Sequence, residues 1–285
     1  MTPPRRTRGW LDQLAQELSR RDWAVLEDLG RVRLLTGRQV QRLHVTNGSA
    51  LTQARRARSV MERLNDLELV SRLERRVGGM RSGSAGFTYA LSAVGQRLIT
   101  GRGPAGGVRL RRYWEPSRPF VDHLLGVSEL YVKLRELEGT DEQIELLDFE
   151  AEPVAWRSWW GAGGERRTIR PDAFVAVGDG RDEVVSFVEL DLATESQRII
   201  AKKAEQYLTY WHSGEEQRRL GVFPKVVFVV PDEHRAAAIT GTLSKLEPES
   251  WQLFQVVRQE VAAEALAGRP PPGQTGSHRS TTSAA

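Results

Sequence analysis

The chain has 285 residues, a formal net charge of +4 and a hydrophobic content of 40%. This length suggests about two domains, and the absence of cysteine excludes disulfide scaffolds, thiolate zinc sites and cysteine nucleophiles. No apolar run is long enough to cross a bilayer, and no apolar segment follows the paired arginines near the start, as a signal peptide would require. We therefore expect a cytoplasmic protein that has no membrane partner.

Composition divides the chain into five segments. We expect a flexible basic arm at 1–9, a mostly helical domain at 10–100, a glycine- and proline-rich linker at 101–117, a second domain at 118–267 and a disordered tail at 268–285. The first lysine is Lys133, so the positive charge before it comes from arginine, which suits bidentate contacts to phosphate and guanine. A genome that favours arginine codons explains most of this bias equally well.

Elements of the 10–100 region follow the order of a winged helix-turn-helix: helix, short extended step, helix, turn, longer helix, two strands and a short helix. They are expected at Arg21–Leu29, at Leu34–Thr36, in a helix capped by Thr36 that carries Gln39, Val40 and Leu43, at the turn His44–Ser49, at Leu51–Leu67, at Val70–Val77 and Phe87–Ser92, and around Val94, Leu98 and Ile99. Thr36 is a residue type that caps helices. His44 is interpreted as a turn or core-edge residue.

Arginines concentrate on the two elements that contact DNA in this fold. On the helix Leu51–Leu67 the apolar stripe contains Ala57, Val60, Met61, Leu64 and Leu67, whereas Arg55 and Arg58 lie opposite it and Arg56 and Arg63 lie on its flank. The two-stranded wing carries Arg72, Arg75, Arg76 and Arg81. We therefore predict binding to double-stranded DNA, with the helix in the major groove and the wing on phosphates or in the minor groove. A solvated helix face and a protein-binding winged helix are the alternatives. A homodimer on a symmetric site is also considered, but no interface is specified.

The region after the linker alternates helix and strand. A helix is expected at Arg118–Leu137, with His123 on its buried stripe and Glu129 solvated. The later elements are the strands Ile144–Val154, Thr168–Val177 and Val184–Asp191, the helix Glu195–Trp211, the strand Val226–Val230, the helix Asp232–Leu246 and the strand Trp251–Val257. Trp156, Trp159 and Trp160 lead into a loop at Gly161–Arg167, where they could stack on bases or close a hydrophobic edge. The fold class is α/β (α+β), with an α-β-β-β-α-β core in this region.

Acidic side chains lie at the ends of two of these strands. Glu189 and Asp191 point to the same face of their strand because side chains alternate, and Asp172 joins them if the two strands are neighbours. Three carboxylates at one sheet edge repel one another, and Mg²⁺ removes that cost by taking oxygen ligands. Asp172, Glu189 and Asp191 are thus predicted metal ligands for phosphodiester chemistry. They could also simply end their strands.

This pattern resembles the restriction-endonuclease-like superfamily, whose signature is Pro-Asp, a spacer, and then Asp/Glu-x-Lys. Pro171-Asp172 and Glu189 match, but Asp191 stands where the lysine is expected. The resemblance implies that a base on the following helix can replace that lysine, and Lys203 is the candidate here. A solvated helix face is the alternative for Lys203.

Both halves together are similar to the replication-relaxation family. The residues that carry the similarity include Leu35-Thr36 with Gln39, Gly86-x-x-Tyr89-x-Leu91, Gly95, His123 with Tyr131, Pro171-Asp172, Phe187-x-Glu189-Leu190-Asp191-x-x-Thr194-Glu195 and Lys203-x-x-x-Tyr207. The resemblance implies a DNA-binding protein of plasmid or mobile-element replication or transfer, with other replication or transfer proteins as partners.

Three activities follow from these patterns. The first is a Mg²⁺-dependent DNA nuclease or nickase that uses Asp172, Glu189, Asp191 and Lys203. The second is a non-catalytic replication or transcription regulator with a degenerate nuclease fold, which the substitution at Asp191 favours. A relaxase with Tyr207 or Tyr210 as nucleophile is disfavoured, because both tyrosines fit helix packing and the five histidines are scattered.

Overall fold

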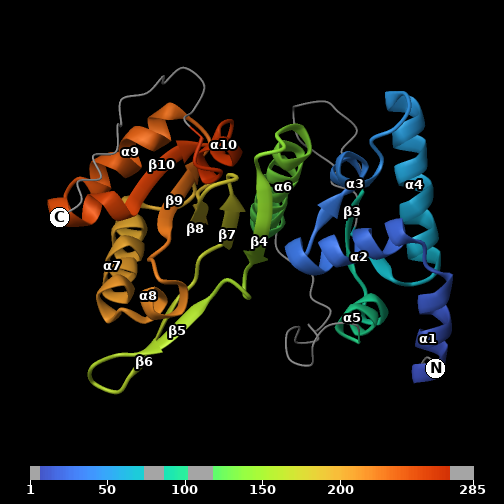
Figure 1. The fold of residues 1–285 in the computed structure, drawn as a ribbon, viewed down its shortest axis with the longest axis horizontal. Helices are drawn as coiled ribbons and strands as arrows, with labels where there is room; N and C mark the ends of the chain where they lie inside the picture. Colours follow the sequence, from blue (N-terminus) through green and yellow to red (C-terminus); the bar gives the residue numbers. More distant parts are fainter. Residues whose placement is uncertain (1–6, 74–86, 102–117, 270–285) are drawn as a thin grey trace. The chain divides into compact units, whose positions relative to one another are not determined.

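The computed structural model describes residues 7–73, 87–101 and 118–269 (Figure 1). The chain divides into two compact units, Met1–Val132 and Lys133–Ala285. The division therefore falls within helix α6 (Arg118–Thr140) and not in the expected linker, of which 102–117 lie outside the described residues. Most of the expected arm and tail also lie outside them, but the first helix already begins at Arg8.

The first unit contains helices and a small antiparallel sheet in the predicted order. Its sheet has the strand order β1-β3-β2. The helices are α1 (Arg8–Glu17), α2 (Arg20–Val32), α3 (Gly37–His44), α4 (Ala50–Asp66) and α5 (Ala93–Thr100), and the strands are β1 (Leu35–Thr36), β2 (Val70–Leu73) and β3 (Thr88–Leu91). Residues 74–86, which include the predicted wing tip, lie outside the described residues.

Side-chain caps set where these helices begin. Ser19 and Thr36 each form a capping box, in which the hydroxyl accepts from the backbone of the third helical residue and that residue's side chain accepts from the cap. Gln39 is the reciprocal partner of Thr36, as the spacing allows. On α4 the residues Ala57, Met61 and Leu64 are buried, which confirms the centre of the predicted stripe.

The first part of α6 belongs to the first unit. Val121 and Leu124 form a cluster with Leu34, and the buried Ser128 hydroxyl donates to the Leu34 carbonyl at 2.6 Å. Glu129 is not solvated as predicted, because Gln39 Nε2 donates to its Oε2 at 3.0 Å and Arg42 Nη1 to its Oε1 at 2.6 Å. The periodicity of α6 alone could not reveal these partners on α3.

The second unit is built on a five-stranded mixed sheet with the order β10-β9-β8-β7-β4. The strands are β4 (Glu145–Ala151), β7 (Ala173–Gly178), β8 (Glu183–Leu190), β9 (Lys225–Val230) and β10 (Phe254–Arg258). β4, β7 and β8 pair antiparallel, whereas β8, β9 and β10 pair parallel. The order α6-β4-β7-β8-α7-β9 agrees with the predicted α-β-β-β-α-β core.

Two helices cover one face of this sheet. α7 (Gln197–Ser213) and α9 (Glu233–Leu243) contribute Ile200, Tyr207 and Ile239 to a core that also contains the sheet residues Phe187 and Phe228. α7 lies beside α8 (Glu215–Leu220) in Figure 1. The short helix α10 (Ala262–Leu266) follows β10. No helix in the described ranges has the length and apolar character needed to span a bilayer.

The predicted strand Thr168–Val177 is two strands. β6 (Arg166–Ile169) pairs with β5 (Arg157–Trp160) in a separate hairpin, and β7 begins only at Ala173. Pro171 lies in the gap and has no N–H to donate to a ladder. The predicted loop Gly161–Arg167 is therefore the tip of this hairpin and the start of β6. Similarly, the predicted strand at 251–257 begins at Phe254, after a 3₁₀ helix at Pro248–Leu253.

Candidate functional site

Asp172 and Glu189 are brought together at the junction of β7 and β8. Ala173 is paired with Val188, so Asp172 lies beside the end of β8. The Asp172 N–H donates to the Val188 carbonyl at 2.9 Å, and its Oδ2 accepts from the Leu190 N–H at 2.7 Å. Both carboxyl groups are buried. The predicted convergence of these two acids is thus present.

Helix α7 supplies two partners for Glu189. Lys203 Nζ donates to Glu189 Oε2 at 2.7 Å, and the Tyr207 hydroxyl donates to Oε1 at 2.5 Å. Lys203 and Tyr207 are four residues apart and therefore lie on the same helix face. Lys203 also pairs with Glu195 Oε1 at 2.8 Å. The predicted site lysine is therefore in the cluster, as an ion-pair partner of Glu189.

Burial controls the protonation of this cluster. It raises the pKa of Glu189, and the nearby charge of Asp172 raises it further; Lys203 and Tyr207 oppose this only in part, so that the pKa reaches about 7. Burial lowers the pKa of Lys203, but Glu189 and Asp172 outweigh it and the pKa is raised overall. Burial and the neighbouring Glu189 raise the pKa of Tyr207. At neutral pH Lys203 is charged and Tyr207 is a neutral donor.

Asp191 has a different set of partners. Arg235 on α9 binds its Oδ2 through Nη2 and through Nε, the latter at 2.9 Å, and the Ala193 N–H donates to Oδ1 at 2.6 Å. Arg235 Nη2 also donates to the Glu195 carbonyl at 2.6 Å. Sequence reasoning missed Arg235, because it lies 44 residues from Asp191 and no local pattern connects them.

The three carboxylates do not form the open oxygen cluster that the sequence predicted. Both oxygens of Glu189, both of Asp191 and Oδ2 of Asp172 already accept from protein donors. Across residues 7–73, 87–101 and 118–269, no group of three or more His, Cys, Asp or Glu side chains could hold a metal ion. The carboxylates as arranged do not fit Mg²⁺, because most of their oxygens already accept hydrogen bonds from the protein. Binding of Mg²⁺ by this protein stays a prediction. What the arrangement provides is a buried ion-pair network that links β7, β8, α7 and α9.

The predicted DNA-binding arginines of α4 differ in what they contact. Arg55 and Arg58 are exposed and make no hydrogen bond or ion pair with any residue that the structure describes. Arg56 Nη1 donates to the Asn47 carbonyl at 3.3 Å. Arg63 Nη2 binds the buried carboxylate of Asp22, which links α4 to the start of α2. Arg63 therefore has a structural role, whereas no described residue forms an ion pair with Arg55 or Arg58.

The pKa of Asp22 reflects its contacts with Arg63 and Ser19. Desolvation by burial raises the pKa of its carboxyl group, but the ion pair with Arg63 and the hydrogen bonds from Ser19 outweigh that effect and lower the pKa. Ser19 contributes both its hydroxyl, at 2.6 Å, and its backbone N–H, at 2.8 Å. The N-terminus of α2 is thereby fixed to the helix that carries the exposed arginines.

The wing is described only at its base. Arg72 is exposed and lies over the ring of Phe87, with 4.1 Å between its guanidinium carbon and the ring centroid. The other predicted wing arginines, Arg75, Arg76 and Arg81, lie outside the described residues. Arg72 is therefore the one member of that set that can be assigned a surface position.

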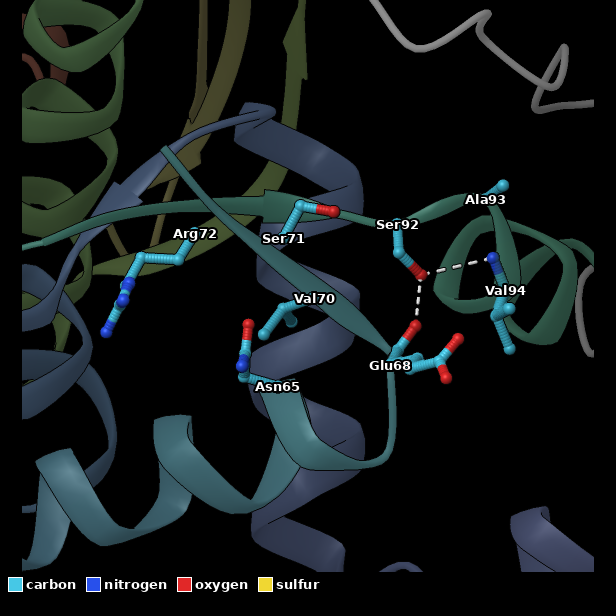
Figure 2. A pocket seen from close by; sticks show the side chains of 8 residues that line it. All are labelled: Asn65, Glu68, Val70, Ser71, Arg72, Ser92, Ala93 and Val94. Atoms are coloured by element: carbon cyan, nitrogen blue, oxygen red, sulfur yellow. Dashed lines mark hydrogen bonds between the residues drawn. The ribbon is translucent and has the colours of Figure 1, made fainter. Parts of the chain in front are cut away.

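A hollow of about 530 Å³ lies at the foot of the wing, between α4, β2 and α5. Figure 2 shows Arg72 at one end of it and Ser92, Ala93 and Val94 at the other. The Ser92 hydroxyl donates to the Glu68 carbonyl and accepts from the N–H groups of Val94 and Gly95. Because the first N–H groups of α5 are already satisfied and the Glu68 carboxylate lines the hollow, we assign no ligand to it.

The fold and the site define a two-unit α/β protein with an arginine-bearing helix in one unit and a buried acidic cluster in the other. A family model, replication-relaxation, matches residues 26–226, which is more than half of the chain. The chain belongs to this family, which is connected with the replication of plasmids and mobile elements. Neither the curated proteins nor the solved structures gave a match to it.

Proposed function

We propose that this protein binds double-stranded DNA in the replication of a plasmid or mobile element. In this proposal the first unit is a winged helix-turn-helix, with α4 in the major groove and the base of the wing against the backbone. The observation that carries the proposal is the exposure of Arg55 and Arg58 on α4, where neither makes a hydrogen bond or ion pair with a described residue. Arg42 and Arg63, in contrast, are engaged with carboxylates.

The test is a double substitution, Arg55→Ala with Arg58→Ala, measured by titration with duplex DNA at several salt concentrations. Each of the two arginines that contacts a phosphate reduces the slope of log affinity against log salt by about one when it is lost, and each that contacts a guanine costs about 1–3 kcal/mol, roughly 5- to 150-fold. Arg181→Ala with Arg198→Ala is the matched control, because both side chains are exposed and the charge change is equal. Equal weakening by the two double variants would contradict a specific role for α4.

For the second unit, we propose a restriction-endonuclease-like fold in which the acidic cluster serves stability and not catalysis. The donors that already occupy the carboxylates of Glu189 and Asp191 support this reading. Burying unpaired carboxylates is costly, and Lys203 and Arg235 offset that cost here. The protein is then a non-catalytic binder, the second of the activities that the sequence suggested.

The nickase remains the alternative, and the pairing of Asp172 with Glu189 is the feature that favours it. Supercoiled plasmid incubated with the protein and Mg²⁺ distinguishes the two. We expect no nicked product with the wild-type protein, with or without a chelator. A nicked product that disappears in Asp172→Asn would replace our proposal with a nuclease.

A further inference from the structure

We propose that the β5–β6 hairpin of the second unit binds single-stranded DNA, with Trp160 and Trp156 stacking on bases. The hairpin extends from the edge of the large sheet in Figure 1 and forms a two-stranded sheet of its own. Only its tip was predicted, as the loop Gly161–Arg167, and the pairing of β5 with β6 places the side chains of the hairpin on defined faces.

Alternation along the strands gives the hairpin one buried and one exposed face. Trp159 and Ile169 are buried, and Trp159 packs on Tyr210 with ring centroids 4.7 Å apart. Trp160, the next residue, points the other way and 71% of its surface is exposed. An indole left in water while its neighbour joins the core is not explained by the packing of this unit.

Positive charge lies on the same exposed face. Trp160 pairs across the hairpin with Arg166, which is exposed. Below them Ser158 pairs with Thr168, and their hydroxyls are 2.8 Å apart. An aromatic ring beside an arginine matches the two components of a single strand, which are stacked bases and a charged backbone.

A second aromatic–arginine pair extends this surface. Arg170 lies over the ring of Trp156, with 4.9 Å between its guanidinium carbon and the ring centroid, and Trp156 is itself 38% exposed. Trp156 and Trp160 lie four positions apart on the segment that leads through β5. The surface therefore offers two rings, each with an arginine beside it.

A groove of about 460 Å³ next to the hairpin provides a path for the DNA backbone. Its lining comes from β5, from Tyr210 and from α8, and it includes Trp156, Arg157, Arg218 and Arg219. The groove also contains the carboxylates of Glu215 and Glu216. Arg218 pairs with Glu215, Arg157 and Arg219 pair with Glu216, and the Tyr210 hydroxyl donates to Glu216. Three arginines therefore line this path against two carboxylates.

Single strands are favoured over duplex DNA because only unpaired bases expose their faces to an aromatic side chain. A strand that has been separated for replication offers such bases. The inference does not require α4 to bind duplex DNA, because every residue that carries it belongs to the second unit.

The test is the affinity of the full-length protein for an oligonucleotide of about 15 deoxythymidines, a length within the range that such surfaces occupy. Trp160→Ala is expected to weaken binding about 5- to 150-fold, the range for loss of one base–aromatic stack. Trp160→Phe keeps a ring and should restore most of the affinity. Trp251→Ala is the matched control. Trp251 is likewise an exposed tryptophan, with 49% of its surface exposed, but it lies before β10 and away from the hairpin.

The inference is overturned if Trp160→Ala binds the oligonucleotide as tightly as the wild type does, if Trp251→Ala weakens binding equally, or if the wild type has no affinity for it at low salt. Arg55→Ala with Arg58→Ala is run in parallel on duplex and single strand. If duplex binding fails while single-strand binding depends on Trp160, the role of α4 is refuted and the role of the hairpin stands.

Discussion

Glu189→Gln tests the electrostatic description of the buried cluster. In the folded protein the pKa of Glu189 is raised from its usual 4.5 to about 7, by burial and by Asp172. The folded state therefore holds this proton more tightly than the unfolded state. The stability that the group contributes is fully present below pH 4.5 and is lost as the pH rises through about 7.

The magnitude follows from the size of that pKa change. Each pKa unit corresponds to about 1.4 kcal/mol, so the loss between these two pH values is roughly 3 kcal/mol. Glutamine cannot ionise, and the variant lacks this loss. Relative to the wild type, Glu189→Gln should therefore gain roughly 3 kcal/mol in free energy of unfolding between pH 4.5 and 7, whatever constant offset the substitution itself causes.

The assay is denaturant unfolding at a series of pH values, followed by tryptophan fluorescence for wild type and variant. Subtracting the free energy of unfolding of one protein from that of the other at each pH cancels the contributions of carboxylates that titrate alike in both. Glu205→Gln, on the exposed face of the same helix α7, is the control for the loss of one carboxylate from this helix. A flat difference for Glu189→Gln across this range would refute the raised pKa, and with it the buried juxtaposition of Asp172 and Glu189.

Two further predictions concern the first unit. Gly95→Ala would place a Cβ atom 2.1 Å from the Leu69 carbonyl oxygen, so α5 must shift at a cost of about 2 kcal/mol or more. Gly30→Ala is the control, because its Cβ meets only ordinary contacts and the substitution should be neutral or stabilising by up to about 1 kcal/mol. Thermal melting compares the two variants, and equal effects would contradict the close approach of Gly95 to Leu69. Asp22→Asn should destabilise the unit by about 2 kcal/mol at neutral pH. Because folding lowers the pKa of Asp22, the stability that this group contributes is present above pH 3.8, its usual pKa, and is lost as the pH falls through the pKa of the folded state. The difference in free energy of unfolding between the wild type and Asp22→Asn should therefore shrink in acid. A difference that grows there would refute the ion pair with Arg63.

Local signals in the sequence were sufficient for much of the fold. Thr36 was predicted to cap the helix that carries Gln39, and α3 begins there; the structure adds the reciprocal bond from Gln39 that completes a capping box. The apolar spacing on α4 and the alternation before Glu189 located a helix and a strand within a few residues of their observed bounds. These predictions succeed because they depend on neighbours within one or two turns of the chain.

The candidate site was predictable in part. Pro171-Asp172 and Glu189 identified the acidic junction, and the spacing of Lys203 and Tyr207 placed both on one face of α7. Such reasoning named Lys203 as the base of the site but did not predict Arg235 as the partner of Asp191.

Only the tertiary structure decided those partners. Arg235 reaches Asp191 because β8 and β9 are parallel neighbours and α9 follows β9, a relation that no sequence spacing encodes. Trp160 is exposed because β5 pairs with β6 across a glycine-rich turn, and this pairing directs the Trp160 ring away from the face that Trp159 buries. Sequence by itself specified periodicity, caps and the types of charged residue. Which charges meet is settled by strand pairing and burial, because the energy of a charge depends on the dielectric and on the groups that folding places around it.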